Sequence, residues 1–184
     1  LLAEKNGDTI STAANTKFAD IPAHAWYSGY VKYLSNNGIT YGKSKTIFAP
    51  NDAITRAEFT TMAVRFFDVY GDGDAEIMEQ FSGFNDVSSG YWAAEYIKYA
   101  ALHGWINGYG DGSFHADREI NRAEVVTIVN RLLGREADED YIADNLRKLN
   151  TFPDVSRKHW AYYAVMEAAN AHTAVLGENE SWSK

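Results

Sequence analysis

Cysteine is absent from this chain of 184 residues, which excludes disulfide bonds and thiolate metal sites. The apolar runs are too short to span a bilayer. Basic residues are in the minority, with 17 Lys and Arg against 25 Asp and Glu and a formal charge of -8. This balance argues against nucleic acid and an anionic membrane surface as partners, because both need a clustered basic face. An anionic ligand held by one or two arginines remains compatible with it.

Common catalytic and metal-binding motifs are also missing. The 5 His residues are dispersed without an H-E-x-x-H pair, and no G-x-S-x-G sequence is present. The segment from Asp68 to Glu79 has only a faint resemblance to a calcium loop, because Tyr70 stands at a ligand position. We therefore expect no enzyme activity, no metal site and no cofactor.

Hydrophobic residues make up 46% of the chain and aromatic residues 14%, enough for a folded core. The chain opens Leu1-Leu2-Ala3 without a Met or a recognisable signal peptide. We interpret it as a piece of a longer protein that carries a cargo domain.

An internal repeat is the strongest signal in the sequence. The motif Phe-x-Asp followed by Ile or Val occurs three times, and a Trp follows each copy. The copies begin at Phe18, Phe84 and Phe152, and the tryptophans are Trp26, Trp92 and Trp160. The first two copies align without a gap at a shift of 66 positions, which also pairs Arg56-Ala57-Glu58 with Arg122-Ala123-Glu124.

Each full copy predicts two helices. In copy one, Tyr30, Val31 and Leu34 recur at helical spacing, and Gly38 is expected to end that helix in the left-handed conformation, as Gly104 does in copy two. The second helix is expected to follow Thr55 or Asn121, each with a Glu three residues later as in a capping box. The apolar stripes of these second helices are Phe59, Met62, Ala63 and Phe66 in one copy, and Val125, Ile128, Val129, Leu132 and Leu133 in the other.

The segments between copies are acidic, and we expect short helices there. Their candidate buried residues are Ile77, Met78 and Phe81 in one segment, and Tyr141, Ile142, Leu146 and Leu149 in the other. The predicted fold is all-α, with a lead-in over 1–17 and repeats over 18–83, 84–151 and 152–184. A single copy has too little apolar area to stand alone, so the copies should pack together about a pseudo-threefold axis.

The ordered pattern F-x-D-[VI], Trp, G-[IW]-x-x-G and [TN]-R-A-E resembles the surface-layer homology (SLH) domain family over about residues 18 to 171. The resemblance implies a three-pronged helical spindle in a secreted protein of the bacterial surface layer. It implies non-covalent anchoring to the cell wall, through a pyruvylated aminosugar polymer bound in grooves between repeats. The residues that match the family's binding positions are Asp20, Trp26, Gly42, Arg56, Asp86, Trp92, Gly108, Arg122, Asp154 and Trp160. Copy three departs at His172, where the helix-ending Gly should stand, and has no T-R-A-E equivalent, so its second half is degenerate or truncated.

Elementary chemistry leaves alternatives open for these residues. Arg56 and Arg122 stand at the start of a helix, where free N–H groups and a guanidinium together trap anions, but each could instead pair with a carboxylate, including one in a neighbouring copy. The three tryptophans could stack on a sugar or fill the core. The three aspartates are expected to secure the loop that enters the first helix. Gly42 and Gly108 are expected to adopt positive φ, and they would also let a sugar approach the backbone. The alternative function is a protein-interaction module of the surface layer.

Overall fold

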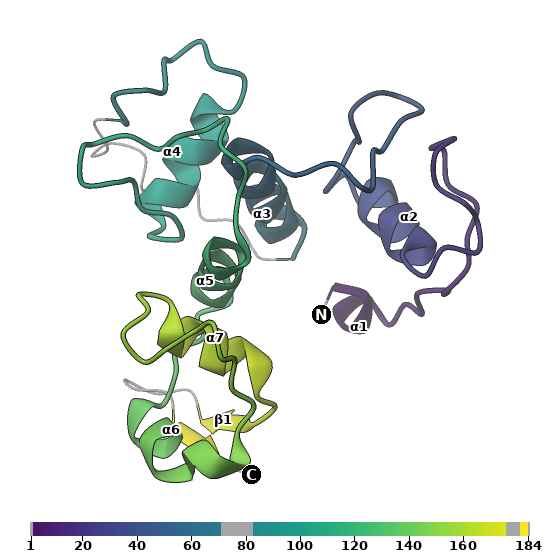
Figure 1. Cartoon of the computed structure of the whole chain (residues 1–184). Coiled ribbons are helices and arrows are strands. Elements are labelled where there is room, and N and C mark those ends of the chain that lie inside the picture. Colours follow the sequence, from purple (N-terminus) through teal and green to yellow (C-terminus); the bar gives the residue numbers. More distant parts are fainter. Residues whose placement is uncertain (1, 71–82, 176–180, 184) are drawn as a thin grey trace.

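The computed structural model of the chain describes residues 2–70, 83–175 and 181–183, and Figure 1 traces their helices. The elements in chain order are α1 (Leu2–Asn6), α2 (Ser28–Asn36), α3 (Arg56–Tyr70), α4 (Ala94–Leu102), α5 (Arg122–Leu132), α6 (Glu139–Asn145), the 3-10 helix η1 (Leu146–Lys148), α7 (Tyr162–Ala169), β1 (Thr173–Val175) and β2 (Ser181–Ser183). The fold is helical, which confirms the all-α prediction. Among the described residues, no helix is both long and apolar enough to cross a membrane.

The first helices of copies one and two end as their sequences predict. Gly38 and Gly104 have φ of +73° and +70°, a conformation that Gly adopts without a Cβ clash. The residue after each Gly then donates its N–H back into the last turn, from Ile39 to Leu34 O at 2.9 Å and from Trp105 to Ala100 O at 2.9 Å. These bonds satisfy carbonyls that the end of a helix leaves open.

The second helices, α3 and α5, begin with the predicted capping boxes. The Asn121 side chain accepts from Glu124 N at 3.0 Å while the Glu124 carboxylate accepts from Asn121 N at 3.0 Å. Thr55 and Glu58 exchange the same two bonds at 3.2 and 2.9 Å. Both devices satisfy N–H groups at the helix start and orient each Glu side chain back over the opening turn.

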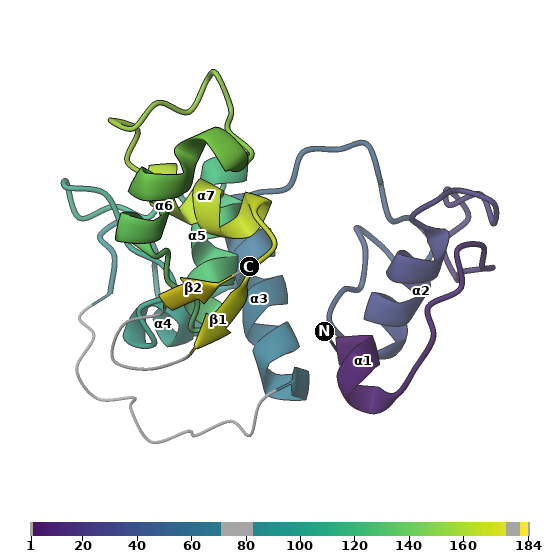
Figure 2. The ribbon, with the colours of Figure 1, turned by 90° about the horizontal axis from the view of Figure 1, so that it is seen from below.

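Helix pairs in the fold combine halves of successive repeats. The second helix of copy one, α3, packs on α4 of copy two, and α5 of copy two packs on α7 of copy three. The helices α3 and α5 also contact each other at the centre, whereas α1 and α2 form a separate lobe, as Figures 1 and 2 show. The extended segments before α3 and α5 lie antiparallel, with Arg56 N donating to Arg118 O at 2.9 Å and Ile120 N to Ile54 O at 3.0 Å. The pseudo-threefold spindle remains a prediction.

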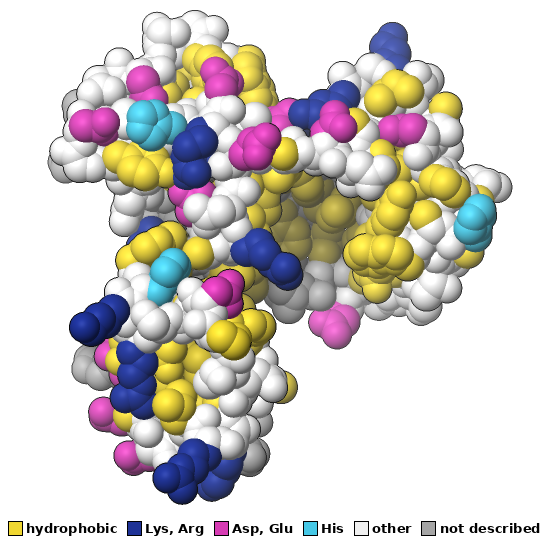
Figure 3. Space-filling view, viewed as in Figure 1, with side chains coloured by type: hydrophobic (Ala, Val, Ile, Leu, Met, Phe, Trp, Pro, Cys, Tyr) yellow, Lys and Arg dark blue, Asp and Glu magenta, His cyan; other side chains and the backbone are white. Residues whose placement is uncertain are grey.

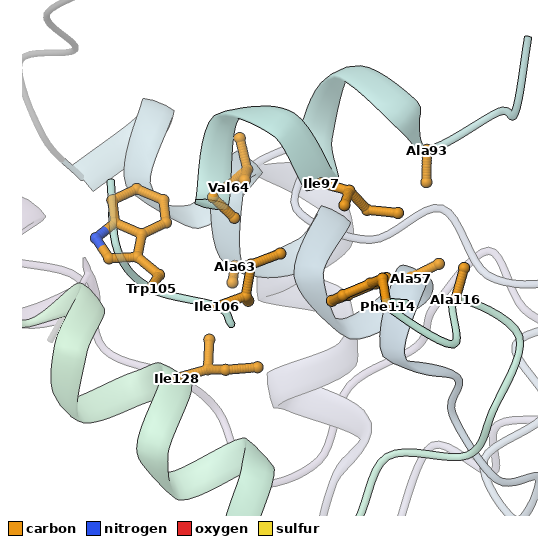
Figure 4. Close-up of a cluster of buried hydrophobic side chains, with 11 residues drawn as sticks. Ala57, Ala63, Val64, Ala93, Ile97, Trp105, Ile106, Phe114, Ala116 and Ile128 are labelled. Carbon is orange, nitrogen blue, oxygen red and sulfur yellow. The ribbon is translucent and has the colours of Figure 1, made fainter. Parts of the chain in front are cut away.

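The largest hydrophobic cluster lies between α3, α4 and α5, and Figure 4 shows it. Ile97 and Phe114 are its most deeply buried large side chains, and burial of each contributes roughly 1.5–3 kcal/mol. Its buried members are Ala57, Ala63, Val64, Ala93, Ile97, Ala100, Trp105, Ile106, Phe114, Ala116 and Ile128. Of the predicted stripes, Phe59 and Ala63 lie in this cluster with residues of the next copy, and Ile128 and Leu132 join the same cluster, whereas Val129 is exposed.

A second cluster covers the inner side of α6 and α7. Its buried members are Ile142, Tyr162, Met166 and Trp182, with Tyr141, Leu146 and Leu149 packed against them. The prediction for the segment between copies two and three is thus confirmed. The corresponding candidates between copies one and two, Ile77, Met78 and Phe81, lie outside the described residues.

Copy three continues into a short antiparallel hairpin, β1–β2, a small addition to the helical fold. His172 stacks on the Trp182 ring at 3.9 Å between centroids, and its Nε2 lies 3.3 Å from Glu167 Oε2. The backbone N–H of Trp182 also donates to Asp138 Oδ2 at 3.0 Å. The residue that replaces the expected Gly therefore helps to hold the hairpin against α6 and α7.

Candidate functional site

Two surface hollows of similar size, about 340 and 350 Å³, lie where one repeat meets the next. We call them the first and the second groove. The first groove is lined by Thr40, Tyr41, Gly42, Lys43, Phe48, Ala49, Pro50, Asp52, Ala53, Ile54, Glu58, Thr61, Met62, Arg65 and Trp92. The second groove is lined by Arg56, Trp105, Ile106, Asn107, Gly108, Tyr109, Glu124, Thr127, Ile128, Arg131 and Trp160. Figure 3 shows how strongly the surface is hollowed between the lobes.

The two grooves are built from equivalent parts of the repeat. Each takes the loop after a first helix, one face of the following second helix, and the Trp of the next copy. The shift of 66 positions pairs Gly42 with Gly108 and Glu58 with Glu124. It also pairs Lys43 with Tyr109, Thr61 with Thr127, Met62 with Ile128 and Arg65 with Arg131. A duplicated sequence thus produces a duplicated concave site.

Glu124 is the centre of a charged network in the second groove. Its Oε1 accepts from Arg56 Nη1 at 2.9 Å and from the Tyr109 hydroxyl at 2.9 Å, and Arg118 Nη2 also bonds to it. Burial raises the pKa of the Glu124 carboxyl, but the Asn121 N–H, the Tyr109 hydroxyl and the two guanidiniums outweigh burial and lower it. The carboxylate is therefore ionised and surrounded by donors.

Glu58 holds the same place in the first groove with a different partner. Lys43 Nζ lies 2.5 Å from its Oε1, and the Thr55 N–H binds its Oε2. Burial raises the pKa of the Glu58 carboxyl, and the contacts with Lys43 and Thr55 more than compensate, so the pKa is lowered. The Lys43 ammonium thus pairs with the groove glutamate here, as the two guanidiniums of Arg56 and Arg118 do in the second groove.

One further arginine of the second helix lines each groove, Arg65 in the first and Arg131 in the second. Arg65 Cζ lies 4.7 Å from the Tyr41 ring centroid and 5.1 Å from that of Tyr96, which fixes its guanidinium by cation–π contacts. The exposed Arg131 lies with Nη1 3.3 Å from the Asn107 side-chain oxygen, in the amide orientation that also lets Asn107 donate to Ile106 O at 3.0 Å. These guanidiniums stand at one repeat position, so each groove has a cation with donors to offer a ligand.

The repeated tryptophans lie on the surface and not in the core. Trp26, Trp92 and Trp160 are 76%, 56% and 65% exposed. Trp92 lines the first groove and Trp160 the second, whereas Trp26 lines neither. Exposed rings beside a hollow offer flat apolar faces to a ligand. The core-filling alternative for these residues is wrong.

Asp20 and Asp86 secure a loop, but not the loop that we expected. Asp86 accepts from Phe114 N and His115 N, both at 2.7 Å, and Asp20 accepts from Phe48 N at 2.9 Å and Ala49 N at 2.7 Å. Each carboxylate thus reaches 28 residues ahead to the turn before the second helix. The Phe48 N–H lowers the pKa of Asp20. At Asp86, burial is the largest single effect and raises the pKa, but the backbone donors, Phe114 N–H first, together outweigh it and lower the pKa. Neither residue lines a groove.

The loop glycines differ in their backbone requirements. Gly42 has the expected positive φ of +73°. Gly108 does not, so the prediction of positive φ is wrong for it. A Cβ at Gly108 would lie 2.4 Å from Phe84 Cε1 and 2.6 Å from Ser113 O, so crowding by the Phe of the motif explains this Gly. Gly42 is crowded in the same way, since a Cβ there would lie 2.6 Å from both Phe18 Cε1 and Ile47 O. Both glycines line their grooves, but their missing side chains make room for the motif Phe.

The two motif arginines have different surroundings. Arg56 is 5% exposed, pairs with Glu124 of the next copy, and donates from Nε to Phe114 O at 2.8 Å, so the ion-pair alternative holds for it even though it lines the second groove. Arg122 is exposed and lines neither groove. Asp154 is also exposed and lies outside both grooves. The structure therefore gathers Gly42, Trp92, Arg56, Gly108 and Trp160 at the grooves.

Sequence reasoning missed several groove residues. Arg65 and Arg131 follow the motif Arg by nine positions in both copies, a match that the shift of 66 already contains. Lys43 and Tyr109 differ between copies, so a search for repeated residue types passes over them. The same holds for Arg118, which does not line the second groove but bonds to its Glu124 and Tyr109. The fold and the duplicated grooves define a helical tandem-repeat binding module.

Comparison with known proteins assigns this module to a family. The model of the S-layer homology domain matches residues 17–60 and 83–126. The chain is similar to Cell surface glycoprotein 1 of Acetivibrio thermocellus, with 31% identity over 181 residues, 94% of the chain and 7% of that protein. It is 29% identical over 164 residues to the Cellulosome-anchoring protein of the same organism, covering 88% of the chain and 34% of that protein. The Surface-layer 125 kDa protein of Lysinibacillus sphaericus is 29% identical over 131 residues, 70% of the chain and 11% of that protein.

The chain belongs to the S-layer homology domain family, as the sequence motifs indicate. The family and the names of these relatives place it in a secreted, wall-associated protein of the cell surface, with a structural role in surface anchoring. The chain spans at most 34% of the length of these three relatives. The incomplete third repeat remains a prediction.

Proposed function

We propose that the two grooves bind an acidic cell-wall polysaccharide whose charged unit is a pyruvylated aminosugar, and thereby anchor a longer protein without catalysis. One observation carries this proposal: two equivalent hollows each combine an exposed Trp with an Arg and an open Gly loop. A pyranose ring has an apolar face that stacks on Trp, and a ketal carboxylate suits the donor geometry of a guanidinium. Duplication then adds avidity along a polymer.

Each part of the groove has a role in this proposal. Trp92 and Trp160 stack on a sugar ring, Arg131 faces the ketal carboxylate, and Arg65 donates to sugar oxygens in the first groove. Arg56 supports the second groove by fixing Glu124, and its guanidinium adds positive charge at the groove wall. Gly42 and Gly108 contribute loop backbone to the groove walls. The remaining predicted residues, Asp20, Asp86, Asp154, Trp26 and Arg122, are assigned no direct ligand contact.

The test is sedimentation of the chain with purified cell-wall sacculi stripped of protein, with isothermal titration of the released polymer. Trp92→Ala with Trp160→Ala should weaken binding by about thirtyfold or more, the effect of losing a Trp hot spot. Trp26→Ala is the matched comparison, because this ring is equally exposed and lines neither groove. Removal of pyruvate from the polymer should weaken binding to the wild-type chain. Unchanged binding in the double variant, or after loss of pyruvate, contradicts the proposal.

A second candidate is a protein-interaction module of the surface layer, with a cargo protein or a neighbouring subunit in the same hollows. Exposed apolar side chains favour it, among them Tyr30, Tyr41, Ile47 and Val129, of which Tyr41 lines the first groove. Such a module would bind other surface-layer proteins and would fail to sediment with protein-free wall. The sedimentation experiment therefore separates the two candidates.

A further inference from the structure

The two grooves share their frame but carry opposite charge at one equivalent position. Asp52 lines the first groove, and the shift of 66 positions places Arg118 at the same point of the second copy. Lys43 and Tyr109 form a second unlike pair. Because the surrounding elements are duplicated, these two pairs change the electrostatics of the grooves without changing their shape.

The second groove has an excess of positive charge. Arg118 Nη2 bonds to Glu124 Oε1 and to the Tyr109 hydroxyl, both of which belong to groove-lining residues. Arg56 Nη1 lies 2.9 Å from the same Oε1. Arg131 adds a third guanidinium on α5. Three cations therefore stand against a single carboxylate, and that carboxylate already accepts bonds on both oxygens.

The first groove is lined by equal numbers of positive and negative side chains. Lys43 and Arg65 are its cations, and Asp52 and Glu58 are its carboxylates. Lys43 is engaged with Glu58, while Arg65 lies against Tyr41 and Tyr96. Asp52 is exposed on the wall of this groove, where a negatively charged ligand would meet it.

The origin of Arg56 explains part of the difference. It begins α3 of copy one, yet its guanidinium lies in the groove of copy two, so this motif Arg serves the groove one repeat ahead. Among the described residues that line the first groove, no arginine comes from a neighbouring copy. Lys43 is the residue that meets Glu58 there instead.

We infer that the second groove selects the acidic unit of a wall polysaccharide and the first groove an uncharged sugar unit, with Asp52 and Arg118 as specificity-determining residues. This inference rests on the proposed function. Like charges disfavour a ligand carboxylate beside Asp52, whereas the excess of guanidinium in the second groove favours it. A polymer with charged and uncharged units along its length would then bind in one direction only.

The experiment measures each groove alone. Trp160→Ala leaves the first groove as the working site, and Trp92→Ala leaves the second. Each variant is titrated with a pyruvylated N-acetylaminosugar glycoside and with the same glycoside lacking the ketal. The second groove should prefer the charged probe by about tenfold, and the first groove should show no preference for it.

The reciprocal exchange then tests the two residues. Asp52→Arg, in the Trp160→Ala background, should create a preference for the charged probe in the first groove. Arg118→Asp, in the Trp92→Ala background, should abolish that preference in the second. Arg118→Gln is the milder variant if Arg118→Asp fails to fold by circular dichroism, and it should reduce the preference severalfold.

The outcomes separate two failures. If both probes bind but the two grooves show equal preference, or the exchanges leave the preference unchanged, the inference is overturned and the proposed function stands. If neither probe binds to any variant or to the wild-type chain, while wall polymer also fails to bind, the proposed function and this inference both fall.

Discussion

Arg56 and Glu124 form a buried ion pair between successive repeats, with Nη1 and Oε1 2.9 Å apart and side chains 6% and 10% exposed. Arg56 opens α3, and Glu124 lies in the first turn of α5. The pair therefore ties the starts of the two central helices together. The Arg56 guanidinium also donates to Phe114 O at 2.8 Å and Asn107 O at 3.3 Å, so it holds the loop of the second groove as well.

Arg56→Ala should lower the free energy of unfolding by about 3 kcal/mol, because it leaves Glu124 buried without this partner. The loss lies at the low end for a broken buried pair because Arg118 still contacts Glu124. Urea denaturation at pH 7 measures it. Arg122→Ala is the control: it occupies the same motif position, is exposed, and should change stability by no more than about 0.5 kcal/mol. Equal effects in the two variants would refute the structural role of Arg56.

Gly108→Ala should destabilise the fold by roughly 1–3 kcal/mol through overpacking, because the new Cβ would collide with Phe84 Cε1 and Ser113 O. Thermal unfolding followed by circular dichroism measures the change in Tm. Gly110→Ala provides the comparison, because a Cβ there meets nothing within 4 Å and its φ is not positive. A Tm for Gly108→Ala as high as that of Gly110→Ala would contradict this packing.

Stability should fall in acid. The pKa values of Asp20, Asp86 and Glu124 are lowered in the folded chain. Their contribution is fully present above the ordinary carboxyl values, near 3.8 for Asp and 4.5 for Glu, and is lost as pH falls through the lowered folded values. We expect a constant denaturation midpoint between pH 7 and about 5 and a steep decline below about 4.

The substitution Asp86→Asn tests how much one of these carboxyls contributes to the pH dependence of stability. An amide cannot accept the Phe114 and His115 N–H bonds with two equivalent oxygens, so the variant should be less stable than the wild type at neutral pH. The difference should narrow in acid, where the wild-type carboxyl is itself protonated. Denaturation midpoints measured across the pH range give both values, and a difference that stays constant into acid would show that the carboxylate charge is not the cause.

Trp182→Ala should remove the main contact of the C-terminal hairpin and cost roughly 3–5 kcal/mol, since this ring is 6% exposed and stacks on His172. Hydrogen exchange should increase in α6 and α7, which share its hydrophobic cluster, before it increases in α4. Trp160→Ala, at an exposed ring, should leave the exchange rates of α6 and α7 unaltered. Faster exchange in both variants would contradict the docking of the hairpin.

Helix positions and caps were readable from sequence because they depend on near neighbours. Gly38 and Asn121 act through residues at most a few positions away, and the structure confirms both. The β1–β2 hairpin was not predicted, because Trp182 contacts Asp138 across 44 residues and nothing in its immediate sequence reveals the partner. The packing role of Gly108 was hidden for the same reason, since the Phe84 ring that crowds it lies 24 positions earlier in the chain.

About half of the proposed site could be anticipated. Trp92, Trp160 and the loop glycines recur at equal repeat positions and line the grooves. Asp20 and Asp86 also recur, but they bind the backbone of a turn 28 residues later. Repetition alone cannot separate these roles, because duplicated structure and duplicated binding leave the same pattern. Asp52 and Arg118 occupy equivalent repeat positions, but the effect of their opposite charges can be inferred only when the two grooves are compared.

Because α3 packs on α4 and α5 packs on α7, the compact structural unit does not coincide with the sequence copy. It combines the second half of one copy with the first half of the next. A cut at the edge of a copy, for instance before Phe84, would therefore separate α3 from the helix that covers it. A cut just before α5 would keep α3, α4 and the loop residues up to Ala116 together, and it would break the contacts between α3 and α5. Truncation or grafting of such modules should therefore use the boundary just before a second helix. The edge of a sequence copy is the boundary that the repeat suggests, but it divides a packed helix pair.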